Sequence, residues 1–186
     1  MKFPSKSIAA CLLAVTIAAG AFFLSSCSPS GKDKIVYTGV SVTQLELSVK
    51  LGYNFISDKY ASASYEVVDY DWLVKSYHDI FWAKIFDESI TKWDNRANCT
   101  IFTEEYVGIL QKMYFRDHFH SFSKTERLAI GEFWYIPNPT APLSGHSVVI
   151  AYTNKGVVFI EPQSREKIQL VNLTEADIAS RILRKF

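Results

Sequence analysis

Hydrophobic positions in the second half of the chain follow the pattern of β-strands. Residues 147–152 and 157–160 are rich in β-branched side chains and flank Asn154-Lys155-Gly156, which is typical of a hairpin turn. A two-residue loop at Asn154 and Lys155 would pair Thr153 with Gly156 and so set the register of both strands. Further strands are predicted over residues 128–131, 133–136 and 167–171. We expect these strands to form an antiparallel sheet.

Apolar residues spaced three and four apart predict two long helices before this sheet. One is predicted over residues 70–85, with Asp69 or Asp71 as its N-cap. The other should begin at residue 99 or 100 and continue to about residue 114. Gly108 lies within the second helix and costs about 1 kcal/mol relative to Ala, so we expect close packing at that point.

Two capping-box sequences predict shorter helices. Residues 43–46 start one that ends near Leu51, although the alternating apolar positions also fit a strand. Residues 174–177 start another, which carries apolar side chains to residue 183. Helices followed by strands predict the α+β class, with one domain over residues 40–186.

The N-terminus has the form of an export leader. Lys2 and Lys6 precede an apolar run over residues 8–24, which is slightly short for a membrane span. Leu24-Ser25-Ser26-Cys27 resembles the bacterial lipobox, in which the leader is cut before a cysteine that then carries lipid. The alternative is an ordinary leader in which Cys27 has no role.

The lipobox divides the N-terminal region into a signal peptide over residues 1–26 and a tether over residues 27–39. The short polar tether would hold the domain close to a bilayer through lipidated Cys27. A signal that retains a lipoprotein at the inner membrane would resemble Asp directly after the lipidated cysteine. This chain has Ser28 at that position, which favours the outer membrane of a bacterial cell envelope.

Composition narrows the partners and the chemistry. Charges nearly balance, with 20 Lys and Arg against 19 Asp and Glu, so no basic surface points to nucleic acid. The chain has three cysteines: Cys11 leaves with the leader and Cys27 would carry lipid. Cys99 is then the one free thiol in an exported protein, either buried and inert or kept for its reactivity.

The surroundings of Cys99 favour reactivity. At the start of a helix, unpaired backbone N–H groups and the helix dipole lower a thiol pKa and could also bind an oxyanion. His146 follows Gly145 at the head of a predicted strand, and the hairpin register places His146 opposite Gln163 and diagonal to Glu161. Either Glu161 or Gln163 could orient the imidazole while its other nitrogen serves the thiol.

Cys99, Gly145-His146 and Ile160-Glu161-Pro162-Gln163 together resemble the papain-like cysteine peptidases. The resemblance is to the protease-like C-terminal domain of the mushroom agglutinin and its bacterial relatives, in which a Trp before the cysteine also recurs, here Trp93. It implies a papain-like core, a Cys99-His146-Glu161 triad with Gln163 as substitute, and a cleft walled by Trp93. The expected activity is hydrolysis of peptide or amide bonds.

Two features depart from that resemblance. Relatives often carry acids directly after the cysteine, whereas this chain has Thr100-Ile101, so calcium is implied by the resemblance alone and no cofactor is expected to be required. His118-Phe119-His120 lacks neighbouring acids or thiols, and no metal site is predicted.

Two other functions compete with this interpretation. Peptidoglycan endopeptidases of the NlpC/P60 type are similar in their frequent lipidation and Cys-to-His spacing, but their Cys-Ser-Gly start is missing. A non-catalytic envelope lipoprotein could use the same fold for binding. The substrate is therefore expected to be peptide, protein or peptidoglycan.

Overall fold

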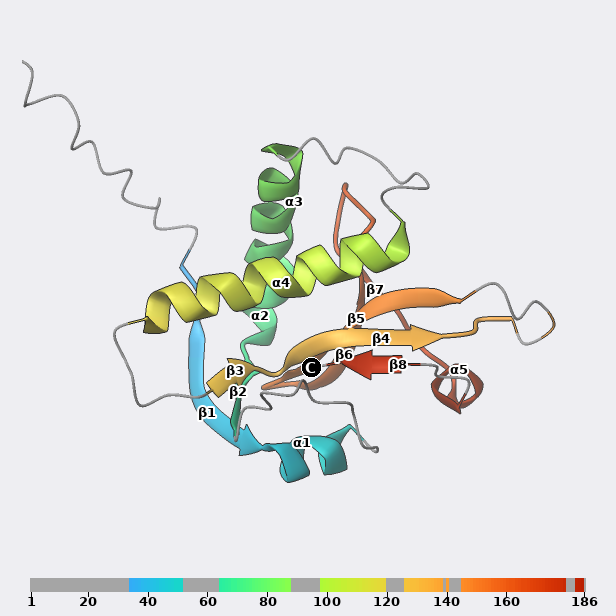
Figure 1. Cartoon of the computed structure of the whole chain (residues 1–186), viewed down its shortest axis with the longest axis horizontal. Helices are drawn as coiled ribbons and strands as arrows, with labels where there is room; N and C mark the ends of the chain where they lie inside the picture. Colours follow the sequence, from blue (N-terminus) through green and yellow to red (C-terminus); the bar gives the residue numbers. More distant parts are fainter. Residues whose placement is uncertain are drawn as a thin grey trace, which may run out of the picture. The chain divides into compact units, whose positions relative to one another are not determined.

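The computed structural model has one β-sheet with helices on both of its faces (Figure 1). The described residues are 34–51, 64–87, 98–119, 126–138, 140, 145–179 and 183–185. Residues 35–186 form one compact unit, and the buried Ile35 and strand β1 begin within the stretch predicted as tether. The α+β class is confirmed.

The strands are β1 (Tyr37–Thr43), β2 (Ser64–Val68), β3 (Glu126–Leu128), β4 (Ile130–Tyr135), β5 (His146–Thr153), β6 (Gly156–Glu161), β7 (Gln169–Leu170) and β8 (Leu183–Lys185). The helices are α1 (Gln44–Lys50), α2 (Tyr70–Trp72), the π-helix η2 (Leu73–Tyr77), α3 (His78–Asp87), α4 (Cys99–His118) and α5 (Glu175–Ala179).

The sheet is mixed, so the prediction of a purely antiparallel sheet is wrong. Its main path runs β1-β2-β5-β4-β8, while β3 pairs with β2, and β6 pairs with β5 and β7. The pairs of β4, β5, β6 and β7 are antiparallel as predicted, but β2 runs parallel to both β3 and β5. The parallel pairs join segments far apart in sequence, which local turn signals do not reveal.

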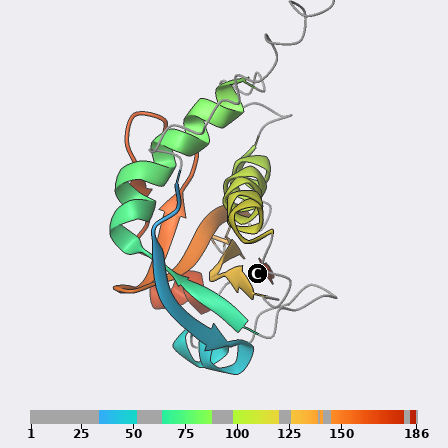
Figure 2. The same ribbon diagram turned by 90° about the vertical axis from the view of Figure 1, so that its left-hand side faces the viewer.

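The two faces of the sheet have separate cores. One face packs against α3 and α4 through side chains such as Phe81, Phe102 and Leu110, together with Val149 of β5. The other packs against α1 through Leu47, Phe133 and Ile150. Figure 1 shows α4 crossing the strands with α1 on the opposite side, and Figure 2 views α4 nearly along its axis. Alternate side chains of β5 therefore point to opposite faces of the sheet, one covered by α3 and α4 and the other by α1.

The β5–β6 hairpin has the predicted register. Thr153 pairs with Gly156 and Val149 with Ile160. Gly156 has a φ of 108°, a left-handed conformation that favours glycine after the turn. The Thr153 hydroxyl donates to the Gly156 carbonyl at 2.7 Å, which closes the turn. The turn at residues 153–156 thus sets the register of the whole hairpin, including its open end, where His146 and Glu161 lie.

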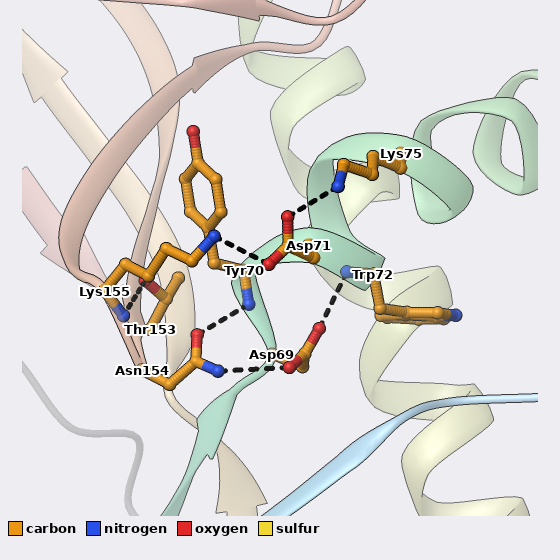
Figure 3. Close-up of polar contacts among 8 residues, drawn as sticks. All are labelled: Asp69, Tyr70, Asp71, Trp72, Lys75, Thr153, Asn154 and Lys155. Carbon is orange, nitrogen blue, oxygen red and sulfur yellow. Dashed lines mark hydrogen bonds and ion pairs between the residues drawn. The ribbon is translucent and has the colours of Figure 1, made fainter.

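Polar contacts clamp the hairpin turn onto the start of α2 (Figure 3). The Asn154 side chain accepts from the Tyr70 N–H at 3.0 Å and donates to Asp69 Oδ2 at 3.1 Å. Lys155 Nζ lies 2.6 Å from Asp71 Oδ2 and 4.7 Å from the centre of the Tyr70 ring. The turn is therefore held at both residues, which anchors the end of the hairpin opposite His146.

Helix boundaries follow their predicted caps more closely than their predicted ends. Thr43 and Glu46 form a complete capping box at α1, which confirms a helix there rather than a strand. Asp69 caps α2, but residues 73–77 form a π-helical segment that the regular apolar spacing does not predict. Helix α4 continues four residues beyond the predicted end, to His118.

The prediction of a helix to residue 183 is wrong at its end. Helix α5 stops at Ala179, and β8 pairs antiparallel with β4 through Trp134↔Leu183. The predicted strand over 167–171 shortens to β7. Pairing with the edge of β4 supplies the backbone of β8 with hydrogen-bond partners, and this tertiary preference outweighs local helix propensity.

Close packing at Gly108 is also a wrong prediction. A Cβ added to Gly108 would meet no atom within 4 Å. Gly108 lies inside α4, where alanine is favoured over glycine by about 1 kcal/mol because the unfolded chain loses less entropy. We therefore expect Gly108→Ala to raise the free energy of unfolding by about 1 kcal/mol in urea denaturation. A destabilised variant would show that α4 needs the glycine for a neighbour outside the described residues.

Candidate functional site

Cys99 is the first residue of α4, as predicted. Asn98 is the N-cap, and its side-chain oxygen accepts from the N–H groups of Thr100 and Ile101 at 3.1 and 3.3 Å. The Phe102 N–H donates to the Asn98 carbonyl. Among the described residues, the Cys99 N–H itself has no acceptor, so it is the amide at this helix end that is left for a ligand.

His146 and Glu161 meet across the β5–β6 hairpin. His146 Nε2 lies 2.6 Å from Glu161 Oε2, and both side chains are partly buried. The register explains the contact, because Glu161 is the diagonal neighbour of His146 on the same face. A short, partly buried bond of this kind holds the imidazole in one orientation and stabilises its charged form.

A hydrogen bond between the Cys99 thiol and the His146 imidazole shifts the pKa values of the two groups in opposite directions. This bond is the main cause that lowers the pKa of Cys99 below its ordinary value, while burial acts in the opposite direction. Hydrogen bonds with Cys99 and then Glu161 raise the pKa of His146 to about 9. Since Glu161 contacts Nε2, Nδ1 is the ring nitrogen left for the sulfur. These opposite shifts favour the charged pair of thiolate and imidazolium over the neutral pair of thiol and imidazole.

Two further groups support the thiolate. The backbone of Ser147 and the side chain of Thr100 each hydrogen-bond with the Cys99 sulfur and lower its pKa. Neither residue is among the predicted site residues. Ser147 contributes its backbone, which no side-chain pattern reveals. The N-cap Asn98 was also missed, although asparagine is a residue type that is recognisable from sequence as an N-cap.

Tyr135 is another neighbour that sequence reasoning missed. It pairs with His146 across the β4–β5 ladder, and its ring meets the imidazole edge-on with centroids 5.8 Å apart. Tyr135 is buried, and burial is the main cause that raises its pKa, followed by the nearby carboxylates of Asp177 and Glu161. The contact depends on the β4–β5 register, which no turn signal specifies.

The remaining predicted site residues are Gln163, Gly145, Trp93 and Cys27, and the two that the structure describes lie outside the side-chain contact between His146 and Glu161. The Gln163 backbone N–H donates to Glu161 Oε1 at 3.2 Å, so Gln163 acts on the carboxylate, while Glu161 makes the side-chain contact with His146. Gly145 is exposed immediately before β5. Trp93 and Cys27 lie outside the described residues.

The histidines outside the pair are placed differently from one another. His78 lies in α3 and is only 3% exposed. Burial lowers its pKa, and the Ser164 backbone lies beside its ring. His118 Nδ1 lies 2.9 Å from the Tyr114 carbonyl, and His120 is outside the described residues.

The described residues contain no cluster of three or more His, Cys, Asp or Glu side chains that could hold a metal ion. Within the same ranges, no helix has the length and apolar character needed to cross a membrane.

Comparison with known proteins gives similarity in fold. No family model and no curated protein matches the chain. A crystal structure of the Polyporus squamosus lectin, bound to the human-type influenza-binding epitope Neu5Aca2-6Galb1-4GlcNAc, matches with a TM-score of 0.52 and 14% identity. A PSL1a–E64 complex matches with a TM-score of 0.50 and 15% identity. Both matches cover 78% of this chain, which spans about half the length of each neighbour, 49% and 50% respectively.

Proposed function

We propose that the protein is a lipid-anchored cysteine hydrolase with a papain-like core that cleaves peptide or amide bonds. The observation that carries the proposal is the position of His146, which lies 2.6 Å from Glu161 and whose pKa is raised by hydrogen bonds with Cys99 and Glu161. A thiol, a base and an acidic orienter in contact are the parts of an activated nucleophile. The fold similarity to the PSL1a–E64 complex supports the same proposal.

The first half of the reaction forms a thioester. The Cys99 thiolate attacks the carbonyl carbon, a carbon–sulfur bond forms, and the carbonyl electrons move onto oxygen. The Cys99 N–H is placed at the helix start to donate to that oxyanion. As the intermediate collapses, the carbon–nitrogen bond breaks and the His146 imidazolium gives its proton to the leaving amine.

The second half regenerates the enzyme. Neutral His146 takes a proton from water, which attacks the thioester carbon. The carbon–sulfur bond then breaks, the acid product leaves, and the proton stays on the imidazole beside the thiolate. Glu161 remains ionised throughout and stabilises the imidazolium through its Oε2 contact. Gln163 fixes the carboxylate by donating its backbone N–H to Oε1.

Location follows from the leader. Cleavage before Cys27 and lipidation of its thiol would anchor the domain to a bacterial envelope membrane, with peptides, proteins or peptidoglycan as substrates within reach. Trp93 and Gly145 are proposed to border the cleft. The competing function is binding without catalysis on the same fold.

The test compares the wild-type protein with Cys99→Ala on casein and on purified peptidoglycan. We expect one substrate to be cleaved by the wild type and neither by Cys99→Ala, with circular dichroism showing that the variant keeps its fold. The wild-type thiol should also be alkylated by the epoxide E64. If the folded wild type cleaves neither substrate and E64 does not react, the binding function replaces the hydrolase.

A further inference from the structure

The surface near the C-terminal end of α4 exposes two aromatic rings beside two cationic side chains. Phe115 and Phe119 are four residues apart, as are Lys112 and Arg116, and the two pairs are offset by three residues. We call these four residues the Phe115–Phe119 face, in which Phe119 is the C-cap of α4. Phe115 is 46% exposed and Phe119 71%, while Lys112 and Arg116 are both exposed. The buried side chains Met113 and Tyr114 point into the core instead.

This face lies where the chain enters the compact unit. The Tyr37 hydroxyl, at the start of β1, donates to Asp117 Oδ2 at 2.8 Å, and its ring meets the His118 ring with centroids 4.9 Å apart. Figure 1 shows the beginning of β1 beside the C-terminal end of α4. The preceding Val36 is also exposed. The chain therefore enters the compact unit beside the Phe115–Phe119 face.

The length of chain outside the compact unit limits where such an anchor can be. From Cys27 to Ile35 there are eight residues, which span at most about 29 Å when fully extended. The exposed Leu45 and Val49 of α1 lie beyond the seven residues of β1, which is about 23 Å further along the chain. Of these two exposed apolar surfaces, the Phe115–Phe119 face is the one next to the tether.

We propose that the Phe115–Phe119 face docks on the membrane that holds the lipid of Cys27. The two rings would insert at the level of the headgroups, and Lys112 and Arg116 would contact anionic phosphates. Asp117 does not oppose this, because its carboxylate is engaged by Tyr37 and lies 3.5 Å from the Arg116 Nε. This inference rests on the lipid anchor of the proposed function.

The test places a nitroxide label on the processed lipoprotein in vesicles of phosphatidylethanolamine and phosphatidylglycerol. Cys99→Ser removes the free thiol, and Phe119→Cys then carries the label. Leu45→Cys is the matched control, since Leu45 is 74% exposed against 71% for Phe119. We expect the label at 119 to be shielded from a water-soluble nickel relaxant at least fivefold more than the label at 45, and to collide readily with oxygen.

The outcomes separate the docking from the anchor. If the parent chain does not float with the vesicles, the lipid anchor is wrong and the docking with it. If it floats but nickel reaches both labels equally, the anchor stands and the docking is overturned. Dipolar broadening between labels at 119 would also overturn it, because the face would then bind a second copy of the chain.

Discussion

His146→Ala slows alkylation of Cys99 by iodoacetamide about 10- to 100-fold at pH 6.5. The bond with His146 is the main cause of the lowered thiol pKa, so its loss returns Cys99 toward the ordinary cysteine value, near 8.5. At pH 6.5 such a thiol is only about 1% thiolate, although its greater intrinsic nucleophilicity recovers part of the rate.

The pH dependence of alkylation gives the sign of the effect. In the wild type, the lowered pKa of Cys99 keeps the thiolate to lower pH than in an ordinary cysteine, so the rise of the alkylation rate with pH should be displaced to lower pH. In His146→Ala the rate should rise about tenfold per pH unit up to the ordinary cysteine pKa. His118→Ala is the control, because His118 contacts Tyr114 and not the thiol. Identical profiles for wild type and His146→Ala would rule out the thiolate–imidazolium pair.

Glu161→Gln lowers kcat/KM for the hydrolysis identified above by about 10²-fold or more. A glutamine keeps the shape of Glu161 but loses the charge that stabilises the His146 imidazolium, and oriented acid–base groups contribute about 10²–10⁴-fold. The alkaline limit of activity, set by the His146 pKa of about 9, should move to lower pH, because a raised pKa falls when the carboxylate is removed.

Two matched variants decide which residue orients the imidazole. Gln163→Ala leaves the backbone N–H that donates to Glu161 in place, and we expect it to cost less than tenfold in kcat/KM. Glu166→Gln removes an exposed carboxylate five residues from Glu161 and should have no effect. Equal losses in Gln163→Ala and Glu161→Gln would assign the orienting role to the Gln163 side chain.

Local signals in the sequence predicted the parts of the site that depend on neighbouring residues. The turn at Asn154 and Lys155 determined the hairpin register, and the register alone brought His146 and Glu161 together. Helix caps are equally local, so the start of α4 at Cys99 was predictable. What these signals could not distinguish was Glu161 from Gln163, since both lie on the face of His146.

Contacts between distant segments were out of reach. The parallel pairing of β2 and the pairing of β8 with β4 depend on which strands lack a neighbour in the sheet. The local sequence around Leu183 predicts a helix, and only the pairing with β4 makes it a strand. The Ser147 amide near the thiol and the Tyr135 ring on His146 likewise require the packing of α4 and β4 on β5. The burial of His78 depends in part on the Ser164 backbone, which lies far from α3 in the sequence.

The hairpin origin of His146 and Glu161 has a consequence for how the site assembles. These two residues are 15 apart in sequence, and a hairpin closes in about 1–10 μs, whereas Cys99 reaches them only when α4 docks on the sheet. During refolding, the thiol pKa stays ordinary until that docking occurs. The alkylation rate of Cys99, followed by pulses of iodoacetamide, therefore reports when α4 docks on the sheet during folding.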